Sequence, residues 1–184
     1  WLVTLCAEEP GKIRAFGGFD VPVSVGLEAL DDADTVLMPH WMDPAVIPSP
    51  KLISALQKAA DTGKEVAGLC VGAYPLAYAG LLDGHRAVTH WRFARDFGSR
   101  FPRVALDPRA LYIDDRNRIT SGGFAAGNDC CLYLLRKHEG AAAANDVARN
   151  MLIPPFRDGG QAQFIEEPLA RATPSARINL AMRY

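Results

Sequence analysis

The sequence predicts an α/β protein built as a three-layer sandwich, in which helices cover both faces of a mostly parallel sheet. Short apolar runs rich in β-branched residues alternate along the chain with amphipathic helical patterns. Hydrophobic residues make up 49% of the 184 residues, which is enough for one substantial core. A cysteine between two glycines also stands where an apolar run meets a helical run, the local pattern of a nucleophile elbow.

The first part of the chain predicts strands and one helix. Residues 1–6, WLVTLC, alternate and are β-rich, and residues 12–26 contain two short strands that form a small ribbon, with Pro22 marking an edge. Residues 33–39, ADTVLMP, predict a short buried strand. Residues 49–63 predict a helix, because Ser49 is a capping residue, a proline follows it and a glycine closes the segment.

The middle of the chain repeats this alternation. Residues 64–70, KEVAGLC, predict a strand, and residues 71–82 predict a helix of small side chains that accommodates Pro75 in an early turn. Residues 85–91, HRAVTHW, predict a further strand, and residues 92–101 a helix. Strands that alternate with helices in this way favour a parallel sheet.

The last part predicts strands and then two helices. Residues 103–123 contain strands joined by a polar turn at 114–117. One helix follows from about residue 126 to 138, with Cys131, Leu132, Leu134 and Leu135 along its buried side. A second, alanine-rich helix ends before Pro154, and the Pro- and Gly-rich stretch beyond it predicts a docked tail that leads into a linker.

Charge and composition exclude several classes of function. Twenty basic and 21 acidic residues give a formal charge of −1, so this surface has no basic patch for nucleic acid. No apolar run approaches the roughly 20 residues that span a bilayer, and no leader is visible, so we expect a cytoplasmic protein without membrane contact. Four scattered histidines and no glycine-rich phosphate loop predict neither a metal nor another cofactor.

Cys70 is the strongest candidate for chemistry. Glycines at 68 and 72 permit a sharp strand-to-helix turn, and the start of a helix favours thiolate, so we expect a lowered pKa and the most reactive of four reduced cysteines. The alternative is a cysteine that fills a small space. That second interpretation applies to Cys6, Cys130 and Cys131, which lie in apolar patterns.

His90 is the candidate base for Cys70, because it ends the next predicted strand and parallel sheets gather functional groups beyond their carboxyl ends. The alternative is a histidine satisfied by backbone and packed on Trp91. We assign an oxyanion or pocket-binding role to Val71, Gly72, His40 and Trp41, with the backbone N–H groups of His40 and Val71 as the oxyanion donors. The alternative for His40 is an ordinary loop residue that takes no part in catalysis.

These motifs resemble the PfpI/ThiJ superfamily, with its class I glutamine amidotransferase-like fold, and more closely the N-terminal domain of AraC-family transcriptional regulators. The stretches that carry the resemblance are residues 5–11, 26–39, 68–97, 112–140 and 144–168. Within the last one, PPFRDGGQAQFIE is similar to the regulator branch in particular.

The resemblance implies a flavodoxin-like domain over residues 1–168, without the first strand and helix with which relatives begin. It implies that residues 169–184 form a linker and the start of a helix leading to a helix-turn-helix DNA-binding domain. Cys70 matches the elbow cysteine, and His90 a histidine near it. Val71 stands where protease-like relatives have histidine, and Pro39-His40-Trp41 where enzymes have glycine.

Three functions follow as hypotheses. The first is a ligand- or redox-sensing domain of an AraC-family regulator that binds an unknown small molecule, contacts DNA through another domain and acts as a homodimer without turnover. The second is a cysteine-dependent enzyme of the isocyanide-hydratase or deglycase kind, with Cys70 as nucleophile and His90 as base. The third is a dimerisation module with a relic pocket.

Overall fold

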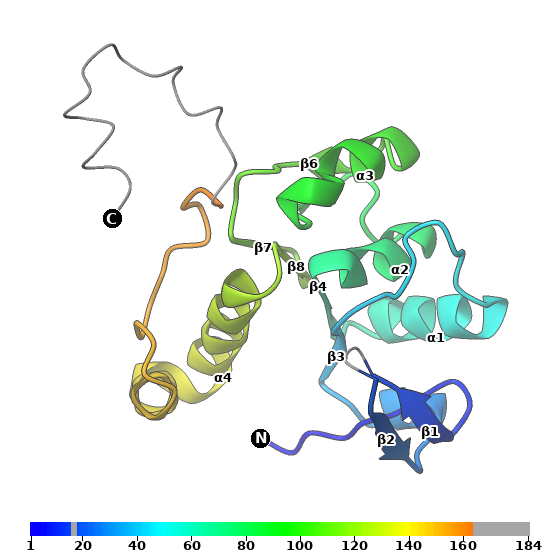
Figure 1. Cartoon of the computed structure of the whole chain (residues 1–184), viewed down its shortest axis with the longest axis horizontal. Coiled ribbons are helices and arrows are strands. Elements are labelled where there is room, and N and C mark those ends of the chain that lie inside the picture. The colour runs from blue at the N-terminus through cyan, green and yellow to red at the C-terminus, as the bar shows by residue number, and fades with distance from the viewer. Residues whose placement is uncertain (16–17, 164–184) are drawn as a thin grey trace.

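The computed structural model of the chain describes residues 1–15 and 18–163, and it has the predicted α/β sandwich architecture (Figure 1). The strands are β1 (Gly11–Arg14), β2 (Asp20–Val23), β3 (Thr35–Met38), β4 (Glu65–Leu69), β5 (Arg86–Ala87), β6 (Ala105–Leu106), β7 (Tyr112–Asp115) and β8 (Arg118–Ser121). The helices are α1 (Pro50–Asp61), α2 (Ala73–Tyr78), α3 (Ala94–Arg100) and α4 (Ala125–Asn150), with the 3-10 turns η1 (Leu27–Asp31), η2 (Cys70–Gly72) and η3 (Trp91–Phe93).

The central sheet has the strand order β3-β4-β8-β7. β3, β4 and β8 are parallel, and β7 is antiparallel to β8. Because three strands run in the same direction, their carboxyl ends meet at one edge of the sheet. Pro39, Cys70 and Gly122 follow these three ends, so the topology gathers the segments in which the candidate site was predicted.

Helices cover both faces of this sheet, as predicted. α1 and α2 contact β4 on one face, α4 contacts β7 and β8 on the other, and Figure 1 shows α4 apart from the α1–α3 group. Val66 and Ala67 are neighbours in β4 but belong to different apolar clusters, because successive strand side chains point to opposite faces. Val66 lies in the same apolar cluster as Leu56 and Tyr74, whereas Ala67 lies in the same apolar cluster as Leu134 of α4.

Local signals placed several elements correctly. α1 begins after Ser49, whose hydroxyl accepts a hydrogen bond from the backbone N–H of Leu52 at 3.1 Å. It ends before Gly63, which has a φ of +84°. The predicted ribbon forms from β1 and β2, which pair antiparallel with Pro22 in the second strand.

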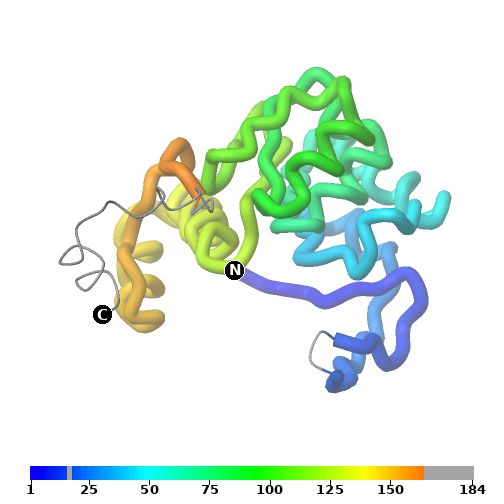
Figure 2. The backbone as a smooth tube through the Cα atoms, turned by 45° about the horizontal axis from the view of Figure 1, so that its top comes forward, coloured from blue at the N-terminus to red at the C-terminus, as the bar shows by residue number. Residues whose placement is uncertain are grey.

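The strand predicted over residues 1–6 is wrong. In the described part of the chain only Cys6 of this segment forms a β-bridge, with Val25, and Leu2 is 94% exposed. Figure 2 shows the segment beginning beside α4 and running from there to the β1–β2 ribbon. An alternating, β-rich sequence forms a strand only where a neighbouring strand satisfies its backbone groups, and residues 1–5 have no such neighbour in the described part.

The two helices predicted near the end form α4, which is broken at Gly140 by non-helical angles of φ 85° and ψ 172°. The assignment of Cys131 to the buried side is wrong. Cys130 is buried and Cys131 is exposed, because the buried face follows the spacing of Cys130 and Leu134, four residues apart. Leu132 is buried as predicted.

Candidate functional site

The elbow forms at the predicted place. β4 ends at Leu69 with extended backbone angles, Cys70 adopts a φ of +57°, and the chain enters η2 and then α2. A left-handed conformation in a residue other than glycine costs on the order of 1–3 kcal/mol and persists only where the surroundings enforce it. The strain therefore marks Cys70 as a residue whose side-chain direction is imposed by the fold.

Three glycines allow the chain to close around Cys70. A Cβ at Gly68 would stand 2.7 Å from the carbonyl oxygen of Gly72, and a Cβ at Gly72 would collide with the carbonyl oxygen of Met38. A Cβ at Gly123, which has a φ of +84°, would stand 2.7 Å from the Cys70 sulfur. The glycines thus serve close packing between strand ends as well as the turn itself.

The thiol of Cys70 is half-buried, and this corrects the predicted direction of its pKa. Burial raises the pKa of Cys70, and a hydrogen bond from the backbone N–H of Val71, which lowers it, does not compensate. The thiol is therefore protonated at neutral pH. The expectation of a lowered pKa was wrong because loss of water outweighs the pull of one short helix start.

His90 lies in an aromatic cluster beside the elbow. Its ring stacks on Trp91 with a centroid distance of 5.5 Å and meets Phe93 and Phe124 edge-on, each at 6.1 Å. Phe124 directly follows Gly123, which packs on the Cys70 sulfur. Thr89 directly precedes His90, and its hydroxyl donates a hydrogen bond to the backbone carbonyl of Cys70 at 2.9 Å.

The hydrogen bonds of His90 define which proton it carries. The backbone N–H of Arg92 donates to Nδ1 at 3.2 Å. Burial, followed by the nearby charge of Arg92, lowers the pKa of His90, so the ring is neutral at pH 7. A neutral imidazole that accepts at Nδ1 carries its proton on Nε2. In this state His90 offers an N–H donor rather than a base.

The other predicted residues divide into two groups. The backbone N–H of Val71 hydrogen-bonds the Cys70 side chain, and a Cβ at Gly72 would lie 3.4 Å from the backbone nitrogen of His40. These three residues are therefore gathered at the elbow. Trp41 is directed elsewhere, because its indole N–H donates to the carbonyl of Val46 at 2.9 Å in its own loop.

Sequence reasoning missed four residues around the elbow: Thr89, Gly123, Phe124 and Gln163. Phe124 combines a φ of +47° with 83% exposure, an unusual state for a large apolar residue. Gln163 is buried, and it lies in the stretch that was predicted as a docked tail and that carries the resemblance to the regulator branch. The glycine pair at 122–123 was a signal for close packing after a strand end, whereas Gln163 had no local signal.

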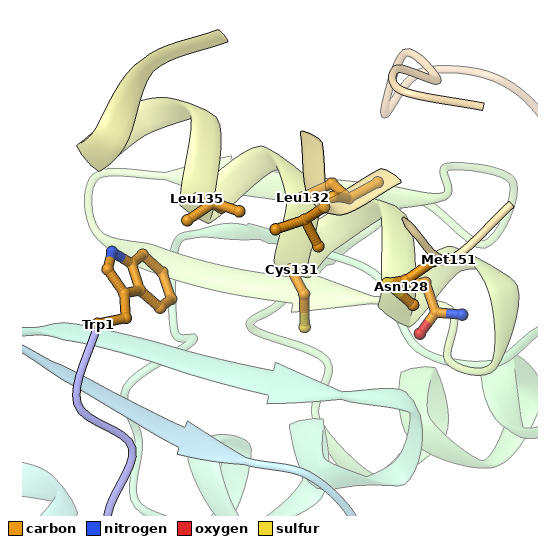
Figure 3. Close-up of a pocket in the computed structure, with 7 residues that line it drawn as sticks. Trp1, Asn128, Cys131, Leu132, Leu135 and Met151 are labelled. Carbon is orange, nitrogen blue, oxygen red and sulfur yellow. The ribbon is translucent and has the colours of Figure 1, made fainter. Parts of the chain in front are cut away.

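An apolar pocket of about 300 Å³ lies away from the elbow, against α4 (Figure 3). Its lining consists of Trp1, Asn128, Cys131, Leu132, Leu135, Val147 and Met151. The break at Gly140 folds the second half of α4 beside the first, and Trp1 closes one side. Neither Cys70 nor His90 lines this pocket.

Over the described ranges 1–15 and 18–163, no group of three or more His, Cys, Asp or Glu side chains could hold a metal ion. In the same part of the chain, no helix combines the length and apolar character that crossing a bilayer requires.

The fold and the elbow define the class: an α/β sandwich domain that carries a cysteine on a strained turn at the carboxyl edge of a parallel sheet. Residues 1–137 match the DJ-1/PfpI family, and the chain belongs to that family.

Curated relatives are mainly regulators. The chain is 35% identical over 161 residues to the HTH-type transcriptional regulator ArgR of Pseudomonas aeruginosa. The aligned region covers 88% of this chain and 47% of that regulator. It is 31% identical over 147 residues to CdhR of the same organism, over 80% of this chain and 44% of that regulator. The isonitrile hydratase of Pseudomonas putida is 30% identical over 130 residues, 67% of this chain and 56% of that enzyme. The chain thus spans about half the length of these relatives.

Solved structures support the same fold. An AraC family transcriptional regulator from Pseudomonas putida superposes with a TM-score of 0.70 at 23% identity, over 80% of each chain. DJ-1beta from Drosophila melanogaster gives a TM-score of 0.67 at 16% identity, over 78% of each chain. The predicted resemblance to this superfamily and to its regulator branch is confirmed, whereas residues 169–184, predicted as a linker and helix start, lie outside the described residues.

Proposed function

We propose that this chain is the sensory domain of an AraC-family transcriptional regulator, in which the region around Cys70 binds a small molecule without turning it over. The similarity to HTH-type regulators over 88% of the chain supports the regulator assignment. In the whole protein, DNA contact belongs to a helix-turn-helix domain outside these 184 residues, and the regulator acts in the cytoplasm as a homodimer.

The absence of turnover is supported by the protonation states that burial favours for Cys70 and for His90. A cysteine nucleophile needs a thiolate and a base. Here burial raises the pKa of Cys70, and His90 presents its Nε2 proton rather than a lone pair. The same groups suit binding, since an N–H and a thiol beside aromatic rings can hold a small polar ligand.

Sensing requires that the ligand bind two arrangements of the domain with unequal affinity, typically by about 1–3 kcal/mol. A redox version replaces the ligand by oxidation of Cys70 to sulfenic acid. The raised pKa of Cys70 favours the ligand version, because oxidation proceeds through the thiolate.

An enzyme of the isonitrile-hydratase kind is the second candidate, favoured by the strained elbow at Cys70 and by 30% identity to that hydratase. Cyclohexyl isonitrile distinguishes the two. The sensory proposal expects no formamide product above the level of Cys70→Ser. Product formation by the wild type that Cys70→Ser loses would establish catalysis and refute the absence of turnover.

The regulatory role is tested on the whole gene product. We expect the coding sequence after Tyr184 to encode a helix-turn-helix domain. In a gel-shift assay on its own promoter, alkylation of Cys70 by iodoacetamide at pH 8.5 should change DNA affinity at least fivefold in the wild type and leave Cys70→Ser unaffected. A stop codon soon after residue 184, or equal affinities before and after alkylation, would contradict the proposal and favour an enzyme or a dimerisation module.

A further inference from the structure

The described part of the tail, up to Gln163, is docked on the loop that precedes β7. The backbone N–H of Leu111 donates to the carbonyl of Gly159 at 2.7 Å, and that of Gln163 donates to the carbonyl of Arg109 at 2.6 Å. Between these contacts Ala162 forms an antiparallel β-bridge with Ala110. The position of Gln163 is thus fixed by the main chain before its side chain is considered.

The side-chain amide of Gln163 reaches the loop that carries His90. Its Nε2 donates to the carbonyl of Thr89 at 3.1 Å, and its Oε1 accepts from the backbone N–H of Trp91 at 3.2 Å. The same Nε2 lies 2.8 Å from the carbonyl of Ala110. One amide therefore bonds the residues on both sides of His90 and the loop on which the tail is docked.

Two links connect this amide with Cys70. The first link is Thr89, whose backbone carbonyl accepts from the Gln163 amide and whose hydroxyl donates to the Cys70 carbonyl. Through the glycine pair, a Cβ on Gly122 would stand 2.6 Å from Gln163 Cδ, and one on Gly123 would stand 2.7 Å from the Cys70 sulfur. Closely packed groups of this kind transmit displacement instead of absorbing it.

We propose that Gln163 is a positioning residue that couples the Cys70–His90 region to the segment 159–163, which is docked on the loop before β7. This inference rests on the proposed sensory function. A ligand or adduct at Cys70 that moves Thr89 or Gly123 breaks the amide contacts of Gln163 and loosens the docked tail. By reciprocity, loosening Gln163 changes the environment of Cys70.

The first experiment uses Gln163→Glu in the 184-residue chain. Glutamate has nearly the same shape but turns two donors into an acceptor that faces carbonyl oxygens, so it should release the loop. Gln161→Glu is the matched control, because Gln161 is exposed and the charge change is identical. The independent ion pair of Arg157 with buried Asp129 keeps the rest of the tail attached in both variants.

Iodoacetamide alkylation of Cys70 is followed by mass spectrometry from pH 6 to 10. We expect Gln163→Glu to accelerate alkylation of Cys70 at least fivefold at pH 7, with Gln161→Glu unchanged. Cys130 is buried and reports global unfolding. Equal profiles in the two variants, or acceleration of Cys70 and Cys130 together, would overturn the coupling.

The reverse direction is measured by hydrogen exchange in Cys70→Asp, which places a carboxylate at the elbow in a conformation that aspartate tolerates. The backbone amides of Leu111 and Gln163 should exchange about tenfold faster than in the wild type, and less than twofold faster when Gln163→Glu is already present. The same factor in both backgrounds, or none, refutes coupling. If alkylation of Cys70 leaves promoter binding unchanged, only the proposed sensory function is refuted. The coupling is tested separately, because the alkylation and hydrogen-exchange measurements do not use DNA.

Discussion

At the scale of single residues, the elbow is held by contacts from distant parts of the chain. Cys70 has a left-handed backbone conformation that a short local sequence does not favour. Gly123 packs against its side chain and the hydroxyl of Thr89 holds its carbonyl. The strain is maintained because relieving it would disturb three segments at once.

Gly123→Ala tests this packing. The methyl group would meet the Cys70 side chain as well as an unfavourable φ of +84°, so we expect a loss of about 3 kcal/mol or more in unfolding free energy. Gly140→Ala is the control, since Gly140 has a φ of +85° with nothing within 4 Å, and it should cost about 1–2 kcal/mol. Urea denaturation measures both. Equal losses would mean that backbone strain alone matters.

The raised pKa of Cys70 gives a second residue-scale prediction. Thiolate is the reactive form, and burial disfavours it, so the alkylation rate of Cys70 should rise with pH with a midpoint above the value of about 8.5 for a free cysteine. Peptide mapping after iodoacetamide treatment assigns the rate, and Cys70→Ser confirms the assignment. A midpoint below 8 would show that a positive group dominates burial, which restores the nucleophile hypothesis.

The same scale shows where sequence reasoning succeeds. Cys70 was found because glycines at fixed spacing between a strand and a helix form a local pattern. Thr89, Phe124 and Gln163 join the site through contacts across 19 to 74 positions of sequence, which no local pattern encodes. The direction of the Cys70 pKa was missed because burial is a property of the folded whole.

At the scale of elements, prediction worked where the local sequence carries its own boundary signals. α1 has a cap, a proline in its first turn and a terminal glycine. Residues 1–6 have a strand-like pattern, but in the described part only Cys6 has a pairing partner, so pattern alone failed there. β5 has only two residues of the strand predicted over 85–91, and directly after it the backbone N–H of Val88 donates to the hydroxyl of Thr120.

Ser49→Ala tests the boundary of α1. Its hydroxyl accepts from the backbone N–H of Leu52 and donates to Glu8 at 2.5 Å, so the substitution should lower stability by about 0.5–2 kcal/mol. Ser54→Ala, at an exposed interior position of the same helix, should be neutral or slightly stabilising because alanine has the higher helix propensity. Opposite signs in urea denaturation are expected, and equal effects would remove the capping role.

At the scale of the whole molecule, the two edges of the sheet carry different groups of residues. The carboxyl edge holds the elbow, whereas the amino edge holds a network around Glu65, the first residue of β4. Its carboxylate accepts from Lys137 at 2.5 Å, from Thr35 at 3.1 Å and contacts His138 at 2.7 Å. Lys137 also bonds Asp114 of β7 at 2.8 Å. The network therefore fastens α4 to three strands.

This network predicts how the fold responds to acid. Burial alone raises the pKa of Glu65, but the hydrogen bonds from Lys137 and His138 outweigh it and place the pKa below its ordinary value. A lowered pKa means that the folded protein gains stability above the unfolded value of about 4.3 and loses it as the pH falls through the folded value.

Glu65→Gln should cost about 1–3 kcal/mol at pH 7, and the difference from wild type should shrink between roughly pH 5 and 3. Urea denaturation followed by circular dichroism measures it, with exposed Glu139→Gln as the control. If the wild type and Glu65→Gln lost stability in parallel over this range, the carboxylate of Glu65 would not be what fastens α4 to the sheet.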